Sequence, residues 1–493
     1  MKGDESMSKI KINAYHTHYE IVGYKIGMFY KLERDLSTRD PITFKYTYYY
    51  HYDAELEILY IPRGYDPNIL CDWFKVPINY VEECNPKAKA TFSIDSPPQD
   101  NFQREVIRFL TGKQEFSHFA GASQQVLNIP TRSGKTYCAV TASSILQCRT
   151  LVVVHGKTLR DQWVEDILKY TQLSKDNIFV IDGSSKLEKL LKMKKRELTN
   201  KYIFLVIHRT LQRTMQDRGM KYLNDVLCHA CIGIKIIDEA HKEFRNTLML
   251  DYATDVWKTF YLTATFALSD GRANAVFQKS FNRVIKLSKV NPNKRKHVNV
   301  IFILYQTRPT PDDLEFILPR RGFNVHNYMT YEIEKGSLER QLVNFLQLVL
   351  EKNQMIEGKI LIVSSTIASI TYFKELLENL YPNKDIYDYY EGHKDDNFRD
   401  YDIVCATPQM LGTGITFPGL QLLINMEPTK SDMNSLQLAG RLTEYAPDKY
   451  TYYVEFVDKS IPSLKSYVKK KQKMLSTAPS VISVSEIDTT IIR

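Results

Sequence analysis

Hydrophobic residues fall in short, almost uninterrupted runs along most of the chain, from about residue 102 to residue 458. Runs of this kind are typical of strands that are buried on both faces, as in a parallel sheet. The longer segments between them repeat their hydrophobic positions at helical spacing. This alternation predicts an α/β fold in which helices cover both faces of parallel sheets.

The expected strands form two groups. The first comprises residues 124–129, 150–154, 178–181, 202–207, 232–237 and 259–263. The second comprises residues 298–304, 359–364, 386–389, 402–406, 421–424 and 451–457, with helices expected near 338–351, 367–380 and 435–442. A polar, basic stretch at 291–297 separates the groups and reads as a linker. We therefore expect a small N-terminal α+β domain (1–95), two parallel-sheet domains in tandem (96–290 and 291–460), and a basic C-terminal helix and tail (461–493).

The N-terminal region contains an aromatic pattern. Alternate positions carry Phe or Tyr from residue 44 to residue 52, and a second alternating stretch follows a turn at 53–55, which predicts a β-hairpin. The favoured interpretation is a half-buried hairpin stabilised by cross-strand pairs. The alternative is a surface that stacks bases, with Lys45, Tyr48 and Tyr50 as candidate nucleic-acid contacts.

Composition sets broad limits. Of the 493 residues 43% are hydrophobic and 25% are charged, which is ordinary for a globular protein, and the formal net charge of +9 suits a polyanionic partner without establishing one. The scattered cysteines form no disulfide framework, and no signal peptide or apolar run near 20 residues is present. We expect a cytoplasmic protein without a membrane partner. Lysine-rich stretches at 186–196 and 465–473 are interpreted as solvated faces, and Cys228, His229 and Cys231 as ordinary packing rather than half of a zinc site.

The segment NIPTRSGKT, at 128–136, has the character of a phosphate-binding loop between a strand and a helix. Backbone N–H groups at the helix start would form an anion-binding nest, to which Thr131, Arg132, Ser133 and Gly134 contribute. Lys135 would reach the β and γ phosphates of ATP, and the Thr136 hydroxyl would bind Mg²⁺. The general pattern has glycine five residues before Gly134, where this chain has Ile129.

A second motif, IKIIDEAHK at 234–242, follows another expected strand. Asp238 would hold Mg²⁺, and Glu239 would polarise the water that attacks the γ phosphate. Together the two motifs predict that the chain binds and hydrolyses a nucleoside triphosphate.

With these residues placed, the chain resembles the superfamily two helicases from about residue 102 to residue 458. Gln103 matches the adenine-reading glutamine of that family, 151–167 resembles motif Ia, DEAH ending at His241 is motif II, and TAT from Thr263 to Thr265 is motif III, which couples hydrolysis to nucleic-acid contact. KILIVSST at 359–366 resembles motif IV, Gly412 and Gly414 fit motif V, and Gln437, Gly440 and Arg441 fit motif VI. The resemblance implies two tandem RecA-like domains, with ATP bound between them and Arg441 and Gln437 acting on it.

The run GTGI, the loop TRSG and the phrase SDGRANAVF resemble the phage UvsW-type branch-migration helicases, a group related to the XPB and RecG-like DNA remodellers. That resemblance implies unwinding, annealing or migration of branched or forked DNA in replication and recombination. Two positions depart from the pattern. Thr416 replaces an acidic residue found in many relatives, and Glu444 replaces the second arginine of motif VI.

Two alternatives remain open from the sequence. An RNA-directed DEAH-type helicase would have the same ATP site, since nothing in the sequence measures preference for the 2′-hydroxyl. A non-catalytic nucleic-acid-binding module could also retain a degenerate ATP fold, although Lys135, Asp238 and Glu239 are all intact.

Overall fold

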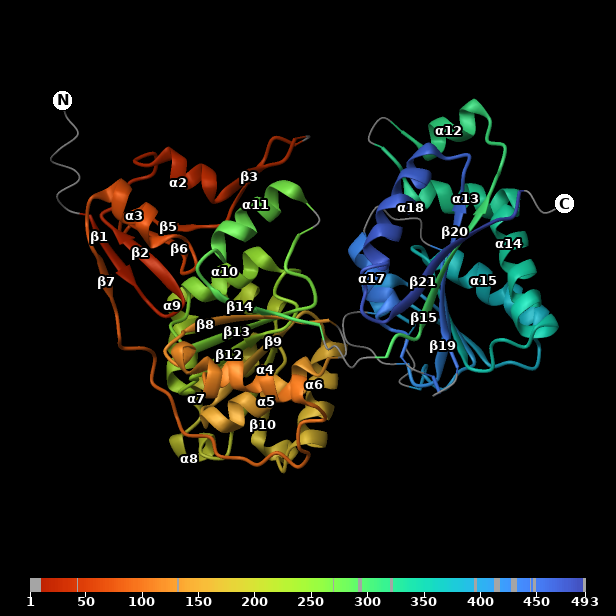
Figure 1. The fold of residues 1–493 in the computed structure, drawn as a ribbon. Coiled ribbons are helices and arrows are strands. Elements are labelled where there is room, and N and C mark those ends of the chain that lie inside the picture. The colour runs from red at the N-terminus through yellow and green to blue at the C-terminus, as the bar shows by residue number, and fades with distance from the viewer. Residues whose placement is uncertain are drawn as a thin grey trace. The chain divides into compact units, whose positions relative to one another are not determined.

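The computed structural model divides into two compact units, Met1–Val290 and Asn291–Arg493 (Figure 1). The described residues are 10–41, 43–130, 133–268, 270–290, 295–319, 322–393, 397–411, 417–426, 432–443, 445–446 and 449–490. Each unit is described by itself.

The first unit begins with a small mixed sheet. Its five strands are β1 (Lys11–Ala14), β2 (His18–Val22), β5 (His51–Asp53), β6 (Ile58–Pro62) and β7 (Ile78–Tyr80), in the order β5-β6-β2-β1-β7. Only the β1–β7 pair is parallel. Helices α2 (Tyr30–Asp35) and α3 (Pro67–Phe74) and a two-stranded sheet of β3 (Ser37–Arg39) and β4 (Tyr46–Tyr48) complete this region.

The expected aromatic hairpin is only partly correct. β5 and β6 pair antiparallel around a turn at 54–57, but the aromatic strand does not run unbroken from residue 44 to residue 52. It breaks after Tyr48, because Tyr49 turns inward and packs on Phe244 at 5.1 Å between ring centroids. β4 therefore pairs with β3 instead of continuing into β5.

The main sheet of the first unit has seven parallel strands in the order β10-β11-β9-β12-β13-β8-β14. Its strands are β8 (Gln124–Asn128), β9 (Thr150–Val154), β10 (Ile178–Ile181), β11 (Ile203–Ile207), β12 (Ile234–Ile237), β13 (Lys258–Thr263) and β14 (Ile285–Ser288). The strands expected from apolar runs are confirmed, with ends that differ by one or two residues. β14 is an additional edge strand.

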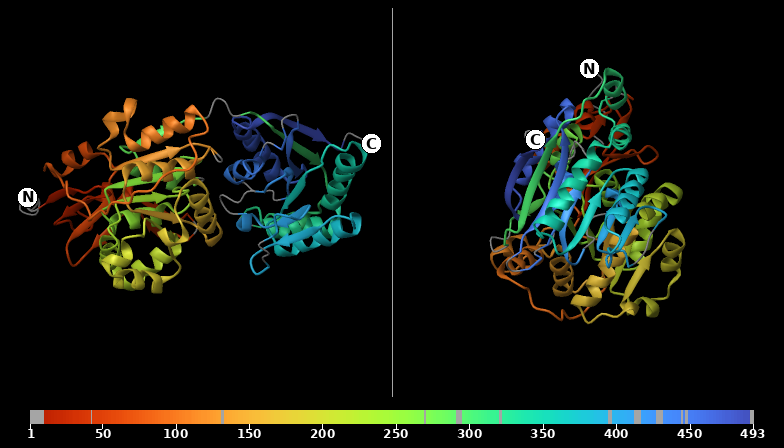
Figure 2. Two further views of the ribbon diagram at one scale, coloured as in Figure 1. Left: turned by 90° about the horizontal axis from the view of Figure 1, so that it is seen from below. Right: turned by 90° about the vertical axis from the view of Figure 1, so that its right-hand side faces the viewer.

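Helices cover both faces of this sheet (Figures 1 and 2). They are α4 (Asn101–Thr111), α5 (Lys135–Leu146), α6 (Lys157–Tyr170), α7 (Ser184–Lys192), α8 (Lys195–Leu198), α9 (His208–His229), α10 (Phe244–Tyr252) and α11 (Gly271–Ser280). One hydrophobic cluster contains residues of α4, α5 and α6. The other combines α9, α10 and α11 with the small N-terminal sheet.

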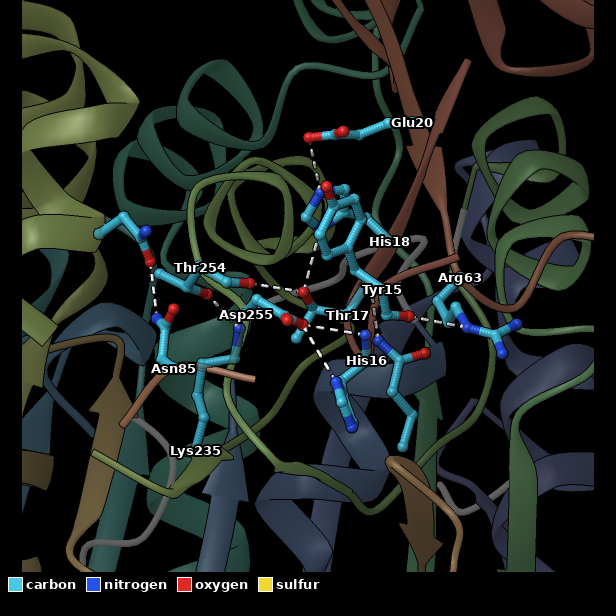
Figure 3. Close-up of polar contacts among 12 residues, drawn as sticks. Tyr15, His16, Thr17, His18, Glu20, Arg63, Asn85, Lys235, Thr254 and Asp255 are labelled. Atoms are coloured by element: carbon cyan, nitrogen blue, oxygen red, sulfur yellow. Dashed lines mark hydrogen bonds and ion pairs between the residues drawn. The ribbon is translucent and has the colours of Figure 1, made fainter. Parts of the chain in front are cut away.

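The N-terminal sheet joins the amino ends of the main strands through buried polar contacts. The Thr17 hydroxyl donates to the Thr254 carbonyl at 2.5 Å, and the His16 backbone N–H donates to Asp255 Oδ1 at 2.9 Å (Figure 3). Gln124, the first residue of β8, donates from Nε2 to the Thr17 carbonyl at 3.0 Å. This junction therefore lies at the end of the sheet opposite to the carboxyl edge.

The second unit contains another seven-stranded parallel sheet, in the order β17-β18-β16-β19-β20-β15-β21. Its strands are β15 (Val298–Tyr305), β16 (Lys359–Val363), β17 (Ile386–Tyr389), β18 (Ile403–Ala406), β19 (Leu420–Asn425), β20 (Thr451–Asp458) and β21 (Val481–Asp488). The expected strands of this domain are confirmed. β21 was not expected: part of the C-terminal tail forms an edge strand on β15.

Helices again alternate with the strands. They are α12 (Pro311–Ile317), α13 (Val325–Lys335), α14 (Ser337–Leu346), α15 (Ile367–Leu380), α16 (Pro408–Leu411), α17 (Asp432–Ala439) and the expected basic helix α18 (Pro462–Leu475). Among the described residues, no helix combines the length and the apolar character needed to cross a membrane.

A buried carboxyl pair lies at the carboxyl end of β20. Glu332 and Asp458 are both fully buried, and Glu332 Oε2 accepts a hydrogen bond from the Leu338 backbone N–H at 3.1 Å. Burial, with a smaller contribution from the Asp458 charge, raises the pKa of Glu332 to about 7. The folded state thus holds this proton more tightly than the unfolded chain, where the ordinary value is 4.5.

We expect Glu332→Gln to stabilise the second unit in a pH-dependent way. Because the folded pKa is raised, ionisation of Glu332 costs stability progressively from about pH 4.5 to about pH 7 and fully above that range. The variant should therefore gain on the order of 1 to 3 kcal/mol over the wild type at pH 8 and nothing below pH 4.5. Urea unfolding across this range measures the gain. Glu334→Gln, at an exposed position on the same helix, is the matched control, and an equal gain in both variants would contradict the expectation.

Candidate active site

Four neighbouring strands of the first unit end at the same edge of its main sheet. In the register, Thr263 of β13 pairs with Asn128 of β8, and Ile237 of β12 pairs with Val153 of β9. The loops that follow these strands carry the phosphate-loop, DEAH and TAT motifs. In open parallel sheets, ligands bind outside the carboxyl ends of the strands, so this edge is the candidate site.

The phosphate loop leads from β8 into α5. Gly134 has a φ of +79° and caps the helix, and no side chain accepts from the N-terminal N–H groups of α5. Ser133 is 7% exposed, and its Oγ has no hydrogen-bond partner among the described residues. The helix start thus offers unsatisfied donors of the kind that bind phosphate. Thr131 and Arg132 lie outside the described residues.

Ile129 occupies the loop position where the general pattern has glycine, and the structure gives it a packing role. Its side chain is fully buried among the core residues beneath α4 and α5. Its backbone N–H donates to the Thr263 carbonyl at 3.2 Å, which extends the pairing of β8 with β13. The loop therefore turns only after this residue.

Gln103 lies against the phosphate loop. It is buried on α4, and its Oε1 accepts from the Gln99 backbone N–H at 2.9 Å. A Cβ at Gly134 would come within 2.4 Å of Gln103 Nε2. The absence of a side chain at Gly134 thus lets the glutamine amide approach the start of α5.

Lys135 and Thr136 form the first turn of α5. Lys135 Nζ donates to the carbonyls of Ile129 at 3.2 Å and Pro130 at 3.4 Å. The ammonium group is thereby held over the loop, where a phosphate can replace the two carbonyls as its partner.

The Asp238 carboxylate is fixed by two donors. Trp163 Nε1 donates to Oδ2 at 2.9 Å, and the Glu239 backbone N–H donates to Oδ1 at 2.9 Å. Burial, and then the Glu239 charge, raises the pKa of Asp238 to about 6, while the Trp163 hydrogen bond and the Lys135 charge act in the opposite direction. A bound cation would stabilise the ionised form of this carboxyl.

Glu239 has a left-handed backbone, with a φ of +49°. Such a conformation costs on the order of 1 to 3 kcal/mol for a residue with a side chain, and strain of this kind clusters at functional sites. The carboxylate is 4% exposed, and its Oε2 lies 3.4 Å from His241 Nδ1 without a hydrogen-bond partner among the described residues. Burial by itself raises the pKa of Glu239, but the charges of Lys135, His241 and other nearby cations outweigh burial and lower it.

The structure brings His241, Thr263 and Thr265 together. The Thr263 hydroxyl donates to the Thr265 carbonyl at 2.5 Å and lies 2.8 Å from His241 Nδ1. Since the single hydroxyl hydrogen is already used, His241 Nδ1 must be the donor to Thr263. A polar chain therefore links the DEAH segment to the TAT segment.

Sequence reasoning missed two histidines beside Glu239. His155 directly follows β9, and its Nε2 lies 3.2 Å from the Glu239 carbonyl oxygen. Its ring stacks on that of His208, which follows β11, at 5.2 Å. Burial lowers the pKa of His155 to about 4, so the ring is neutral near pH 7 and its Nε2 must carry the hydrogen that it donates.

His155 could have been identified as a site residue because it directly follows an apolar strand. Trp163, the donor to Asp238, was also missed. Its signal was the sequence DQW in the motif Ia segment.

The candidate residues of the second unit are less fully described. Arg441 follows α17 and is 6% exposed, and its backbone N–H donates to the Leu438 carbonyl at 2.8 Å. Gln437 belongs to α17, but its side chain lies outside the described residues. Gly412, Gly414, Thr416 and Glu444 also lie outside them.

The N-terminal aromatic residues are about half-exposed. Phe44 is 60% exposed, Tyr46 is 53% exposed and Tyr48 is 45% exposed. Lys45 is exposed as well, whereas Tyr50 is partly buried, which raises its pKa to about 12. These exposures suit both the half-buried hairpin and the base-stacking surface, and each interpretation stays a prediction.

Comparisons with known proteins place these observations in a family context. Residues 96–268 match the family described as type III restriction enzyme, res subunit. The transcript termination protein A18 of Yaba monkey tumor virus is 21% identical over 415 residues, covering 80% of this chain and 79% of that protein.

The solved structure of Dbp5 shares the fold of this chain. S. cerevisiae Dbp5, in a structure bound to RNA and ADP BeF3, matches 79% of this chain and 90% of its own with a TM-score of 0.50 and 12% identity. The structure of T4 UvsW matches 97% of this chain and 99% of its own with a TM-score of 0.38 and 16% identity.

Residues 96–268 thus match the type III restriction enzyme res subunit family, and the chain shares the fold of the Dbp5 structure. The chain's architecture is two tandem RecA-like domains with a small N-terminal α+β region. The expected fold class is confirmed.

The residues present fit ATP and Mg²⁺. The uncapped start of α5 and the unpartnered Ser133 Oγ are donors for phosphate. Thr136 and Asp238 supply the hydroxyl and carboxylate oxygens that Mg²⁺ prefers.

Proposed function

We propose that the chain is an ATP-dependent helicase or translocase that remodels branched or forked DNA. The observation that carries the proposal is the strained, buried Glu239 on the strand-end edge that also holds the uncapped phosphate-loop helix. The match of residues 96–268 to the type III restriction enzyme res subunit family supports an ATP-dependent enzyme that acts on nucleic acid.

Each residue at this edge has a proposed role. Lys135 binds the β and γ phosphates, while Thr136 and Asp238 hold Mg²⁺. When bound, the ion neutralises charge on the phosphates. Glu239 orients the attacking water and accepts its proton, because its lowered pKa keeps the carboxylate ionised.

Further roles are proposed from the motif resemblance. Gln103 reads the adenine base, and the chain from His241 through Thr263 to Thr265 couples hydrolysis to nucleic-acid contact. In the second unit, Arg441 and Gln437 act on the transferred phosphate, and Gly412 and Gly414 contact the nucleotide.

The preference for branched DNA rests on the UvsW-type sequence phrases alone. An RNA-directed helicase is the alternative, and the RNA-bound Dbp5 structure shows that this fold also accommodates RNA in a related protein. A binding module with a dead ATP site is disfavoured, because such a module has no chemical need for a strained glutamate beside an intact lysine and aspartate.

Lys135→Ala tests the nucleotide site. The substitution removes a charge from the phosphates and no core packing, so we expect ATP hydrolysis to fall by at least about a hundredfold while the melting temperature stays near that of the wild type. Phosphate release and thermal unfolding measure the two effects. Lys186→Ala, at an exposed position of α7, is the matched control. Undiminished hydrolysis in folded Lys135→Ala protein would reject the assigned site.

Substitutions of His155 test whether the strained backbone of Glu239 needs its hydrogen bond. His155→Phe keeps a ring to stack on His208 but removes the donor, whereas His155→Gln keeps a donor at similar reach. We expect the phenylalanine variant to lose between about fivefold and a hundredfold in kcat with little change in the KM for ATP, and the glutamine variant to recover most of the loss. If phenylalanine is tolerated better than glutamine, the ring rather than the donor matters, and the assignment is wrong.

A further inference from the structure

An exposed cluster of rings and one guanidinium group lies on the β3–β4 sheet. We call Arg39, Phe44, Tyr46 and Tyr48 the aromatic platform. Arg39 Cζ lies 4.8 Å from the Phe44 ring centroid and 5.7 Å from that of Tyr46. The Tyr46 and Tyr48 rings stack at 6.0 Å with an interplanar angle of 9°.

The register explains why these side chains share a face. Arg39 pairs with Tyr46 across the two strands, and Tyr46 and Tyr48 are two positions apart on β4. The sheet is anchored by a different residue, since Tyr49 is 7% exposed and packs on Phe244. The platform residues keep about half of their surface exposed, which forfeits part of the gain of burying aromatic rings.

The surroundings of the platform favour an anionic, π-stacking partner. Lys45 is exposed and directly precedes β4. Arg245 of α10 and Arg272 of α11 donate hydrogen bonds to backbone carbonyls of β4 and β3. The Asp40 carboxylate accepts from the Thr43 backbone N–H at 2.6 Å and closes the turn. Aromatic faces combined with cations are the chemistry that binds unpaired bases and their phosphates.

We propose that the aromatic platform stacks unpaired bases of single-stranded nucleic acid. This inference rests on the proposed function and deepens it by assigning a base-contacting surface to the N-terminal region. It keeps Tyr48 as a candidate contact and adds Arg39, Phe44 and Tyr46. Tyr50 is partly buried and is not part of the platform.

The platform is attached to the helix that follows the DEAH motif. Arg245 Nε of α10 donates to the Tyr48 carbonyl at 2.9 Å. From the other end of the same helix, the Tyr252 hydroxyl donates to the Tyr49 carbonyl at 2.6 Å. A base that shifts β4 would therefore displace α10, which begins three residues after His241.

The helix that follows the TAT motif holds the second strand of the platform. Arg272 Nη1 of α11 donates to the Arg39 carbonyl at 2.8 Å, and α11 lies beside β3 (Figure 1). Bases bound at the platform thus have a structural path to the DEAH and TAT segments, which meet where His241 contacts Thr263. This path can transmit nucleic-acid binding to the hydrolytic site.

The test compares full-length wild type with Phe44→Ala/Tyr46→Ala/Tyr48→Ala. The probes are a fluorescein-labelled single-stranded oligodeoxythymidylate and an abasic oligonucleotide of the same length, which keeps the phosphates but offers nothing to stack. Binding is followed by fluorescence anisotropy, and melting temperatures verify folding. Tyr30→Ala/Tyr80→Ala is the matched control, because these tyrosines of the same region are 69% and 58% exposed.

We expect the triple variant to lose at least about tenfold in affinity for the base-bearing oligonucleotide and almost nothing for the abasic one. The control should bind both like the wild type. Unchanged affinity in the folded triple variant, or an equal loss for both probes, would overturn the proposal. If wild-type protein binds neither probe, the proposed function itself fails, which separates the two outcomes.

Photocrosslinking provides a test that does not depend on the variant folding. Wild-type protein irradiated with a bromodeoxyuridine-substituted strand should form adducts at Phe44, Tyr46 or Tyr48, located by mass spectrometry of peptides. Adducts found only at other residues would refute stacking at the platform. The same holds if this surface binds another protein instead.

Discussion

The parallel register of β8, β13, β12 and β9 is the constraint on which the rest of the site depends. It brings strand ends that are far apart in the sequence to one edge, where the backbone anchors the motifs directly. The Asp238 N–H donates to the Val153 carbonyl at 3.0 Å, and the Ala240 N–H donates to the Leu262 carbonyl at 3.1 Å. A slip in this register would separate the acidic residues from the phosphate loop.

Glu239 shows how the fold supports a costly conformation. Its left-handed backbone and buried charge are both unfavourable on their own. The surrounding groups offset them: His155 binds the carbonyl, Asp238 accepts from the N–H, and nearby cations stabilise the carboxylate. Such preorganisation leaves an ionised, incompletely hydrogen-bonded oxygen that suits a proton acceptor.

The sequence was sufficient for the two parallel sheets and for the local motifs. Strands buried on both faces are apolar runs, and the phosphate loop and DEAH segment are contiguous, so each is readable without tertiary information. The contact of His155 with Glu239 joins residues 84 positions apart, and no local pattern encodes it. The break in the aromatic strand was equally hidden, because it depends on Tyr49 packing on Phe244 of a distant helix. β21 was missed since a polar strand at a sheet edge has little apolar signal.

The central claim is that the edge around Glu239 hydrolyses ATP in response to nucleic acid. The most direct measurement is the steady-state ATPase rate of the intact chain with Mg²⁺, alone and with saturating single-stranded DNA, forked DNA or RNA. We expect a low rate without nucleic acid and a several-fold higher rate with it, greatest for forked DNA. Protein that binds ATP but hydrolyses none under any of these conditions would contradict the claim.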